Sequence, residues 1–279
     1  MKSLISTDWL DNEIGANDLV ILDATQHVLE PERDAKKEYQ HSHIPTSQFF
    51  DLTNLIDERS NVPKAFPRRE QLVAELARCG AGPSDRIVFY DDSQVKTSAR
   101  AWFICFAHGI ENISILDGGK NKWRSEKRPL SNSPEKPEQK AMFSLPSAKR
   151  LFFKRDVLEN IESKAAQLID ARSHRRFAGL ENEIQGRSTG HIPFSSNLPF
   201  TMLFNEDGTY KSLDKLQAAF NQIGSEKDKP IITTCGSGVT ACVLLFALHL
   251  IGYENTMLYD GSWLDWSLDE ETPKVRFSA

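Results

Sequence analysis

The 279-residue sequence lacks the features that would place it in a membrane, outside the cell or on nucleic acid. No apolar run reaches the roughly 20 residues that a membrane-spanning helix needs. Residues 1–20 contain Asp8, Asp11, Glu13 and Asp18, which excludes a secretory or transit peptide. The formal net charge of −5 is modest and mixed in sign along the chain, so neither nucleic acid nor a membrane surface is an expected partner. The sequence therefore predicts a cytoplasmic protein that acts on small molecules.

Cysteine is also scarce, with four residues at positions 79, 105, 235 and 242. Without a secretory signal, so few cysteines indicate a reducing compartment and free thiols rather than disulfides. The length and the 39% hydrophobic content are sufficient for two domains, each with its own core. Two such domains need no partner to bury a core, so a monomer is expected.

One of these cysteines stands between a predicted strand and a predicted helix. Residues 230–234 are typical of a short buried strand, and the apolar stretch Val239–Ile251 predicts a buried helix. Between them, Gly236 and Gly238 allow the backbone to curl so that successive N–H groups can face one anion. The positive N-terminal end of the helix favours the same charge. A thiolate would be that anion, so Cys235 is the candidate nucleophile rather than a packing cysteine, which would not need a Gly-x-Gly turn.

Three other loop types are excluded by single positions. A P-loop needs Gly-Lys-Ser/Thr at the start of the helix, and residues 238–240 are Gly-Val-Thr. A cysteine phosphatase needs an arginine to clamp phosphate, and Ala241 stands in its place. A dithiol site needs Cys-x-x-Cys, whereas Cys242 is two helical turns away.

The loop sequence Cys-Gly-Ser-Gly-Val-Thr resembles the active loop of the rhodanese superfamily of sulfurtransferases. Its Gly-Ser pair is similar to the branch that uses 3-mercaptopyruvate, whereas rhodaneses of this length that use thiosulfate carry basic residues there. The resemblance implies that Cys235 becomes a persulfide and that no metal or organic cofactor is required. It also implies an active-site loop made of Gly236, Ser237, Gly238, Val239 and Thr240.

An internal repeat shows that the chain is a duplicated domain. His-Ile-Pro occurs at 43–45 and 191–193, Gly-x-Glu-Asn at 109–112 and 252–255, Asp-Gly at 117–118 and 260–261, and tryptophan at 123 and 266. A polar, proline-bearing segment separates the two copies, so we expect domains at 1–130 and 150–279 joined by a linker at 131–149.

Strands and helices alternate in each copy, which predicts the α/β class and a parallel sheet with helices on both faces. Together with the resemblance, this implies two tandem rhodanese-like domains. A long loop is expected between the first strand of each copy and its His-Ile-Pro. The predicted strands are 20–24, 86–90, 113–116, 167–171, 230–234 and 256–259, and the predicted helices are 6–14, 69–78, 99–107, 154–163, 213–223 and 239–251.

The repeat also separates residues of the fold from residues of chemistry. Where the C-terminal copy has Cys235, the N-terminal copy has Asp91 or Asp92, in a loop without glycine. Only the C-terminal copy is therefore expected to be catalytic. His43 and His191 occur in both copies, so we interpret them as histidines that tie a loop. Trp263 has no tryptophan counterpart and could line the pocket, although packing is the favoured interpretation.

Two arginines are candidates for binding a substrate carboxylate. Residues 170–179 resemble the family segment in which an arginine before an aromatic residue reaches the active site, and Arg176 matches it. A guanidinium fork suits a carboxylate next to a carbonyl, although a solvated arginine is the alternative interpretation. The mercaptopyruvate branch has a second arginine where Ile184 or Gln185 stands, and Arg187 could act from a shifted position.

The branch also has an acidic residue and a histidine that are thought to act with the loop serine, and this chain has Thr53 and Lys64 in their places. A relay through these positions is therefore not expected.

From the loop and the repeat we expect a sulfurtransferase that moves sulfur from 3-mercaptopyruvate to thioredoxin, glutathione or cyanide. Two alternatives stay open at this point. One is thiosulfate as the donor, and the other is a non-catalytic persulfide carrier.

Overall fold

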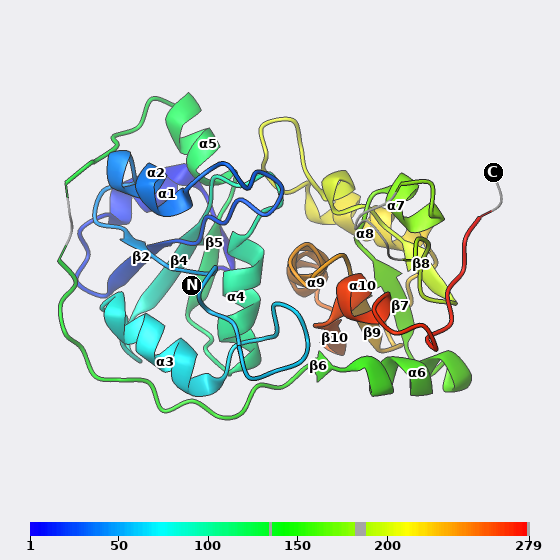
Figure 1. Cartoon of the computed structure of the whole chain (residues 1–279). Coiled ribbons are helices and arrows are strands. Elements are labelled where there is room, and N and C mark those ends of the chain that lie inside the picture. Colours follow the sequence, from blue (N-terminus) through cyan, green and yellow to red (C-terminus); the bar gives the residue numbers. More distant parts are fainter. Residues whose placement is uncertain (134–135, 182–187, 278–279) are drawn as a thin grey trace. The chain divides into compact units, whose positions relative to one another are not determined.

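The computed structural model describes residues 1–133, 136–181 and 188–277 (Figure 1). The chain divides into two compact units. Unit 1 consists of Met1–Asp57, Phe66–Lys149 and Asn205–Tyr210, and unit 2 consists of Glu58–Ala65, Arg150–Phe204 and Lys211–Ala279.

Unit 1 contains a five-stranded sheet in the order β1-β5-β4-β2-β3, in which every neighbouring pair is parallel. Its strands are β1 (Leu4–Ile5), β2 (Leu19–Asp23), β3 (Gln48–Phe49), β4 (Arg86–Tyr90) and β5 (Ile113–Leu116). Its helices are α1 (Thr7–Glu13), α2 (Ala35–His41), α3 (Arg69–Arg78), α4 (Ser98–Ala107) and α5 (Gly119–Ser125).

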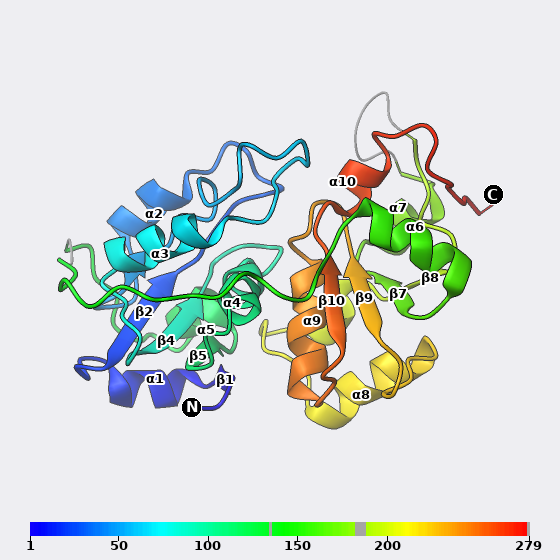
Figure 2. The same cartoon turned by 90° about the horizontal axis from the view of Figure 1, so that it is seen from below.

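Unit 2 repeats this plan, with an all-parallel sheet in the order β6-β10-β9-β7-β8. Its strands are β6 (Leu151–Phe152), β7 (Gln167–Asp170), β8 (Ser195–Asn197), β9 (Ile231–Thr234) and β10 (Thr256–Tyr259). Its helices are α6 (Lys154–Ser163), α7 (His174–Ala178), the 3₁₀ turn η1 (Phe200–Leu203), α8 (Leu213–Gln222), α9 (Ala241–Leu250) and α10 (Ser262–Trp266). Figure 2 shows α9 and α6 on opposite sides of β9 and β10. The predicted α/β class and the tandem duplication are both confirmed.

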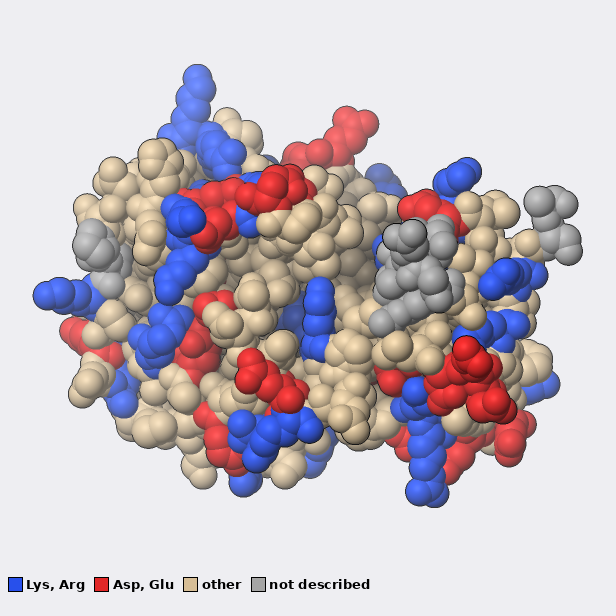
Figure 3. All heavy atoms as spheres, viewed as in Figure 1, with Lys and Arg blue, Asp and Glu red and all other residues tan. Residues whose placement is uncertain are grey.

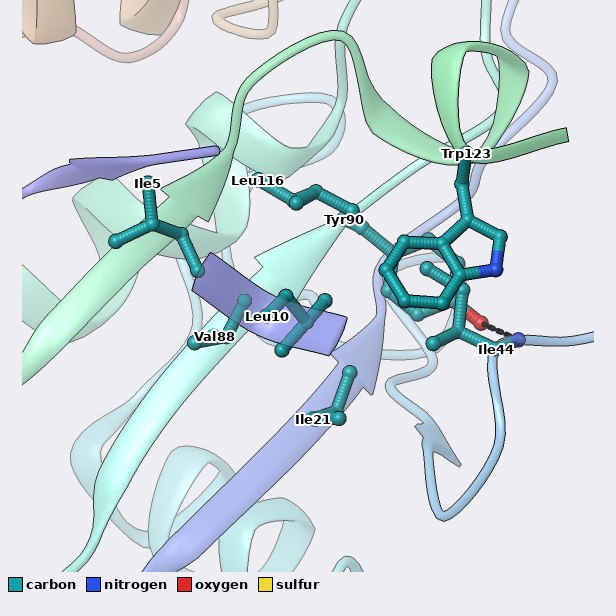
Figure 4. Close-up of a cluster of buried hydrophobic side chains, with 8 residues drawn as sticks. All are labelled: Ile5, Leu10, Ile21, Ile44, Val88, Tyr90, Leu116 and Trp123. Carbon is teal, nitrogen blue, oxygen red and sulfur yellow. Dashed lines mark hydrogen bonds between the residues drawn. The ribbon is translucent and has the colours of Figure 1, made fainter. Parts of the chain in front are cut away.

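The duplication extends to the hydrophobic core. In unit 1, Leu10 of α1 and Trp123 of α5 pack with side chains of β2, β4 and β5 on one face of the sheet (Figure 4). In unit 2, Val157 of α6 and Trp266 of α10 pack with β7, β9 and β10 in the same way. Burial of these side chains, at roughly 25 cal/mol per Å² of apolar surface, stabilises each unit around its own sheet.

The helix that follows Cys235 is buried on nearly every side, as its sequence predicts: Ala241 to Leu248 are all buried. It begins at Ala241 rather than at Val239, which corrects the predicted boundary. Thr240 is the N-cap residue, and Gly238, with a left-handed φ of 77°, belongs to the loop before it.

The expected long loop before each His-Ile-Pro is partly corrected, because it contains one short helix, α2 in unit 1 and α7 in unit 2. In unit 1 this segment contains α2, and the edge strand β3 follows shortly after it. In α2 the Asp34 side chain accepts a hydrogen bond from the N–H of Lys37, and it therefore caps the helix. Helix α2 has no fully buried residue, so its sequence carries little hydrophobic signal for a prediction.

Charged side chains of both signs are interspersed over the face of the molecule in Figure 3, as the mixed sequence predicts. Among the described residues, no helix is both long and apolar enough to cross a membrane.

Candidate active site

Cys235 directly follows β9, and its side chain is 1% exposed. Two hydrogen bonds fasten the start of its loop to α10. The N–H of Trp263 donates to the carbonyl of Cys235 at 3.0 Å, and the N–H of Leu264 donates to the carbonyl of Gly236 at 2.8 Å. The carbonyl oxygens of this turn are therefore held by α10, and the loop is fixed from one side.

The amide groups of the loop are left available. Within the described part of the chain, the N–H groups of Gly236, Ser237 and Val239 donate to no other group. Unpaired backbone donors near a buried thiol are costly unless a ligand or an anion accepts from them. Gly236, Ser237 and Thr240 are half-buried, so a substrate can approach this loop.

The equivalent loop of unit 1 identifies the counterpart of Cys235. The N–H of Ala24 donates to Tyr90 O at 2.8 Å, as that of Ala171 donates to Thr234 O at 2.9 Å. The N–H of Lys120 donates to Asp91 O at 3.0 Å, and this bond matches the one between Trp263 and Cys235. Asp91, and not Asp92, therefore takes the place of Cys235.

The carboxylate of Asp91 shows what such a loop holds. Its Oδ2 accepts hydrogen bonds from the N–H of Ser93 at 3.0 Å and from the N–H of Thr97 at 3.2 Å, and Oδ1 accepts from Ser98 Oγ at 2.7 Å. In unit 1 the loop N–H groups thus surround an anion that the loop itself supplies. Unpaired N–H groups in a loop that begins at a cysteine can bind an anion in a similar way.

Ser262 also belongs to the site, although it was not among the residues predicted from the sequence. Its Oγ accepts a hydrogen bond from the N–H of Cys235 at 3.1 Å, lies 4.0 Å from Cys235 Sγ, and is 2.9 Å from Tyr259 O. A hydroxyl has one proton, so it donates either to Tyr259 O or toward the sulfur. The residue is fully buried.

The backbone at Ser262 is unusual for a residue with a side chain. Its φ is 50°, in the left-handed region that favours glycine. The counterpart in unit 1 is Gly119, with φ 58°, where an added Cβ would lie 2.4 Å from Asp91 O. A serine at a glycine position of the repeat is the signal that could have identified this residue from the sequence, because strained backbone is retained where it serves a site.

Arg172 is a second residue that the sequence analysis missed. Its guanidinium forms an ion pair with Asp170 at 2.7 Å, donates to Gly190 O at 2.8 Å and lies 4.6 Å from the centre of the Trp263 ring. The Arg172 side chain is only 1% exposed. The backbone N–H of Trp263 holds the carbonyl of Cys235. Arg172, which packs on the Trp263 ring, therefore supports the loop indirectly. Trp263 itself is buried in the core of unit 2, so the packing interpretation is supported.

Arg176 lies on α7, where it is half-buried. Strands β7 and β9 are neighbours, with Asp170 paired to Thr234. The carboxyl ends of parallel strands meet at one edge of a sheet, which is where ligands bind in such folds. Helix α7 therefore begins at the same edge as the cysteine loop. Arg187, like Ile184 and Gln185, lies outside the described residues.

The two repeated histidines tie loops to the fold, as expected. His43 Nδ1 is 2.7 Å from Tyr39 O, and His191 Nδ1 is 2.9 Å from Phe177 O. Burial lowers the pKa of His191 below its ordinary value, which keeps it neutral at physiological pH. In the described part of the chain, no group of three or more His, Cys, Asp or Glu side chains is placed to hold a metal ion.

Comparison with known proteins extends the similarity over nearly the whole chain. Residues 6–126 and 154–269 each match the model of the rhodanese-like domain. The chain is 34% identical to thiosulfate/3-mercaptopyruvate sulfurtransferase 2 of Arabidopsis thaliana, over 100% of this chain and 88% of the relative. It is 32% identical to human 3-mercaptopyruvate sulfurtransferase (95% and 92% covered) and 33% identical to bovine thiosulfate sulfurtransferase (95% and 92% covered).

A solved structure agrees with these sequence matches. The crystal structure of SseA from Escherichia coli, described with the 3-mercaptopyruvate sulfotransferases, superposes with a TM-score of 0.84 at 34% identity. The match covers 94% of this chain and 99% of that one.

Proposed function

We propose that this chain, which belongs to the rhodanese family and is a two-domain sulfurtransferase, takes sulfur from 3-mercaptopyruvate and passes it to a thiol or to cyanide. The observation that carries the proposal is the loop of unit 2. It joins a cysteine at the end of a strand to unpaired N–H groups and to the hydroxyl of Ser262. In the same place, unit 1 encloses a carboxylate.

In the first half-reaction, the thiolate of Cys235 attacks the sulfur atom of 3-mercaptopyruvate. A sulfur–sulfur bond forms while the carbon–sulfur bond breaks, and the electron pair of that bond leaves with pyruvate as its enolate. The enolate takes up a proton, and the outer sulfur of the new persulfide loses one. Cys235 is then a persulfide anion next to the loop N–H groups.

In the second half-reaction, a thiolate or cyanide attacks the outer sulfur, and the Cys235 thiolate is the leaving group. Thioredoxin, glutathione and cyanide are the acceptors that we propose. Backbone donors fixed before the reaction stabilise the anion without having to reorganise. Ser237 and Thr240 add hydroxyl donors at the half-buried rim of the loop.

Arg176 is the proposed partner of the substrate carboxylate, and Arg187 is its proposed companion. A guanidinium that binds both carboxylate oxygens holds the sulfur of the substrate in line with the attacking thiolate. A hydrogen bond to a charged group contributes about 1.5–3 kcal/mol. Arg176→Ala is therefore expected to lower kcat/KM for 3-mercaptopyruvate by about 10- to 100-fold.

The donor separates this proposal from its nearest alternative, thiosulfate. A thiosulfate dianion gains from cations in the loop, and residues 236–240 contain none. One observation favours thiosulfate: Thr53 and Lys64 replace the acid and the histidine that the mercaptopyruvate branch places near its serine. For the same reason we propose no proton relay through Ser237. A direct comparison of the two donors is therefore the decisive experiment.

Steady-state kinetics with each donor and a common acceptor should give the higher kcat/KM for 3-mercaptopyruvate. Arg176→Ala and Arg187→Ala, measured beside the wild type, should reduce that value selectively. Cys235→Ser should abolish turnover with both donors. A wild-type rate in Cys235→Ser would overturn the mechanism. A higher kcat/KM for thiosulfate than for 3-mercaptopyruvate would show that thiosulfate is the preferred donor.

The same kinetics test the persulfide-carrier alternative. Repeated turnover with a small thiol acceptor is expected from an enzyme, whereas a carrier would load one sulfur atom and stop.

All four cysteines are free thiols in the structure, and a reducing compartment such as the cytoplasm would keep them so. We propose the cytoplasm as the site of action.

A further inference from the structure

The turn that carries Ser262 is bridged by a tyrosine and an aspartate on either side of it. The hydroxyl of Tyr259, the last residue of β10, donates to Asp265 Oδ2 on α10 at 2.7 Å. Both side chains are buried. The hydrogen bond between them spans residues 260–264, and we call this pair the Tyr259–Asp265 clamp.

The direction of this hydrogen bond follows from the chemistry of the two groups. Burial, together with the hydrogen bond to Asp265, raises the pKa of Tyr259 above its ordinary value, so the hydroxyl keeps its proton and donates. Lys154, the first residue of α6, forms an ion pair with Asp265 Oδ1 at 3.2 Å. A hydrogen bond to a charged acceptor is stronger than one between neutral groups. The clamp therefore connects the end of β10, helix α10 and the start of α6.

Ser262 lies between the two ends of the clamp. Its Oγ is 2.9 Å from the carbonyl oxygen of Tyr259, 3.1 Å from the N–H nitrogen of Cys235 and 4.0 Å from Cys235 Sγ. Its φ of 50° lies in the left-handed region. A residue keeps such a conformation only where the surrounding structure holds it there. The clamp supplies this constraint, because it ties Tyr259 to the helix that Ser262 begins.

The repeat provides an internal control for this interpretation. The three positions of the turn carry different residues in unit 1, namely Leu116, Gly119 and Lys122. Leu116 is an apolar core residue (Figure 4), so its side chain forms no hydrogen bond, and Lys122 pairs with Glu126 at 2.9 Å instead. Glycine adopts the left-handed region at little cost. At this turn, the unit with the cysteine has both the strained serine and the clamp, and the other unit has neither.

We propose that Tyr259 and Asp265 are positioning residues for sulfur transfer and that they act through Ser262. The clamp holds Ser262 in its left-handed conformation, which keeps the hydroxyl beside the N–H and the sulfur of Cys235. Without the clamp, the turn relaxes and the hydroxyl moves away from the cysteine. The inference rests on the proposed function of Cys235 as the nucleophile, and it does not depend on the identity of the sulfur donor.

A double-mutant cycle tests the proposal. Tyr259→Phe removes only a hydroxyl, and it should lower kcat with 3-mercaptopyruvate by about 3- to 10-fold. KM should stay unchanged, because the clamp does not contact the substrate carboxylate. In a chain that already carries Ser262→Ala, Tyr259→Phe should lower kcat no further, because the hydroxyl that the clamp positions is absent. A loss by the same factor in both backgrounds would overturn the proposal.

Two variants of Asp265 test the hydrogen bond itself. Asp265→Asn keeps an oxygen that accepts from Tyr259, so it should retain most of the wild-type kcat, whereas Asp265→Ala should reproduce the loss seen in Tyr259→Phe. An equal loss in both Asp265 variants would show that this hydrogen bond does not position Ser262. Should Tyr259→Phe fail to fold, Asp265→Asn and Asp265→Ala in the wild-type and Ser262→Ala backgrounds give the same cycle.

Tyr253→Phe is the matched control. Tyr253 is also a buried tyrosine of unit 2, and its hydroxyl accepts a hydrogen bond from Gln217 at 3.2 Å. It follows the C-terminal end of α9, whereas the cysteine loop precedes the N-terminal end. Loss of its hydroxyl should therefore leave kcat unchanged. A loss as large as that in Tyr259→Phe would assign the effect to the fold in general and contradict the positioning role.

Alkylation of Cys235 separates this inference from the proposed function. The rate at which iodoacetamide modifies Cys235, followed by mass spectrometry, needs no sulfur donor and reports on the thiolate. It should change by the same factor in Tyr259→Phe, in Ser262→Ala and in the chain with both substitutions. If the rates follow this pattern although the wild type transfers no sulfur, the proposed function fails and the positioning role stands. If the wild type transfers sulfur and only Ser262→Ala alters alkylation, the positioning role fails.

Discussion

At the scale of single residues, Ser262 ties backbone strain to the chemistry of the site. Its hydroxyl is within reach of both the N–H and the sulfur of Cys235, and its φ of 50° is one that L-residues rarely adopt. The repeat places Gly119 at the same turn in unit 1, where no thiol needs a partner. At this turn, the unit with the cysteine thus has a serine in the left-handed region, and the other unit has a glycine.

We predict that Ser262→Gly and Ser262→Ala separate these two roles. Both substitutions remove the hydroxyl, so both should lower kcat/KM by about 10-fold or more. Glycine also relieves the left-handed strain, which is about 1 kcal/mol for a residue with a side chain. Ser262→Gly should thus be more stable than Ser262→Ala in urea unfolding, with similar activity. Unchanged activity in both variants would remove Ser262 from the site.

Asp23 has a predicted effect on the pH dependence of stability. Burial raises its pKa to about 6, against the hydrogen bond from Thr25, which lowers it. A raised pKa means that the folded state binds this proton more tightly than the unfolded chain does. Protonation of Asp23 therefore stabilises the folded state fully below about pH 4. As the pH rises toward 6 this contribution is lost, and the free energy of unfolding falls by up to about 3 kcal/mol.

Asp23→Asn removes this titration. Relative to the wild type, the variant should gain about 1–3 kcal/mol between pH 4 and pH 7. Native-state hydrogen exchange of the amides of β2 and β4 follows the stability of unit 1 specifically. A constant difference between the two proteins over this range would show that Asp23 does not titrate as described.

At the scale of elements, the turn between the last strand and the last helix of each unit helps to shape the central loop. In both units the turn before the last helix lies against the central loop, through the bonds from Lys120 to Asp91 and from Trp263 to Cys235. The contact is so close in unit 1 that Gly119 leaves no room for a side chain. The turn is therefore part of the loop structure rather than a simple connection.

We predict that Gly119→Ala destabilises unit 1 by about 2–4 kcal/mol, because it combines a left-handed φ with a Cβ 2.4 Å from Asp91 O. Gly15→Ala is the matched control. Gly15 also has a left-handed φ, of 91°, but an added Cβ would meet nothing within 4 Å, so its cost should be only about 1 kcal/mol. Equal urea unfolding midpoints of unit 1 in the two variants would contradict the steric argument.

At the scale of the whole molecule, duplication has produced two units with the same sheet and different central loops. Unit 1 holds a carboxylate in its loop, and unit 2 holds a thiol. Two of the cysteines lie in unit 1: burial raises the pKa of Cys79 to about 12 and raises that of Cys105 as well.

We predict that a sulfur donor adds a single sulfur atom to the chain, on Cys235. The thiolate is the reactive form, so Cys79 and Cys105 should stay unmodified at neutral pH. Mass spectrometry of peptides after brief exposure to 3-mercaptopyruvate locates the adduct. An adduct on Cys79 or Cys105 in the folded protein would contradict this expectation.

We also predict that transferring the cysteine to unit 1 does not transfer the activity. In the double variant Cys235→Ser with Asp91→Cys, the new thiol would face loop N–H groups but would have Gly119 in place of Ser262 and Thr25 in place of Arg172. Turnover should remain undetectable. Measurable sulfur transfer by this variant would show that the loop alone is sufficient.

Much of this molecule could be predicted from the sequence, because the relevant signals are local. The alternation of apolar strands and helices, the repeated tripeptide and the glycines after Cys235 each lie within a few consecutive residues. The α/β class, the duplication and the position of Cys235 between β9 and α9 follow from them, whereas exposed elements such as α2, with little hydrophobic pattern, were missed.

Other features were decided only by the tertiary structure. Ser262 meets Cys235 across 27 positions of the chain, and Lys120 meets Asp91 across a similar interval. Arg172 acts through a tryptophan from another strand–helix turn. Such contacts depend on how the sheet brings distant turns to one edge, and no local pattern in the sequence records that arrangement.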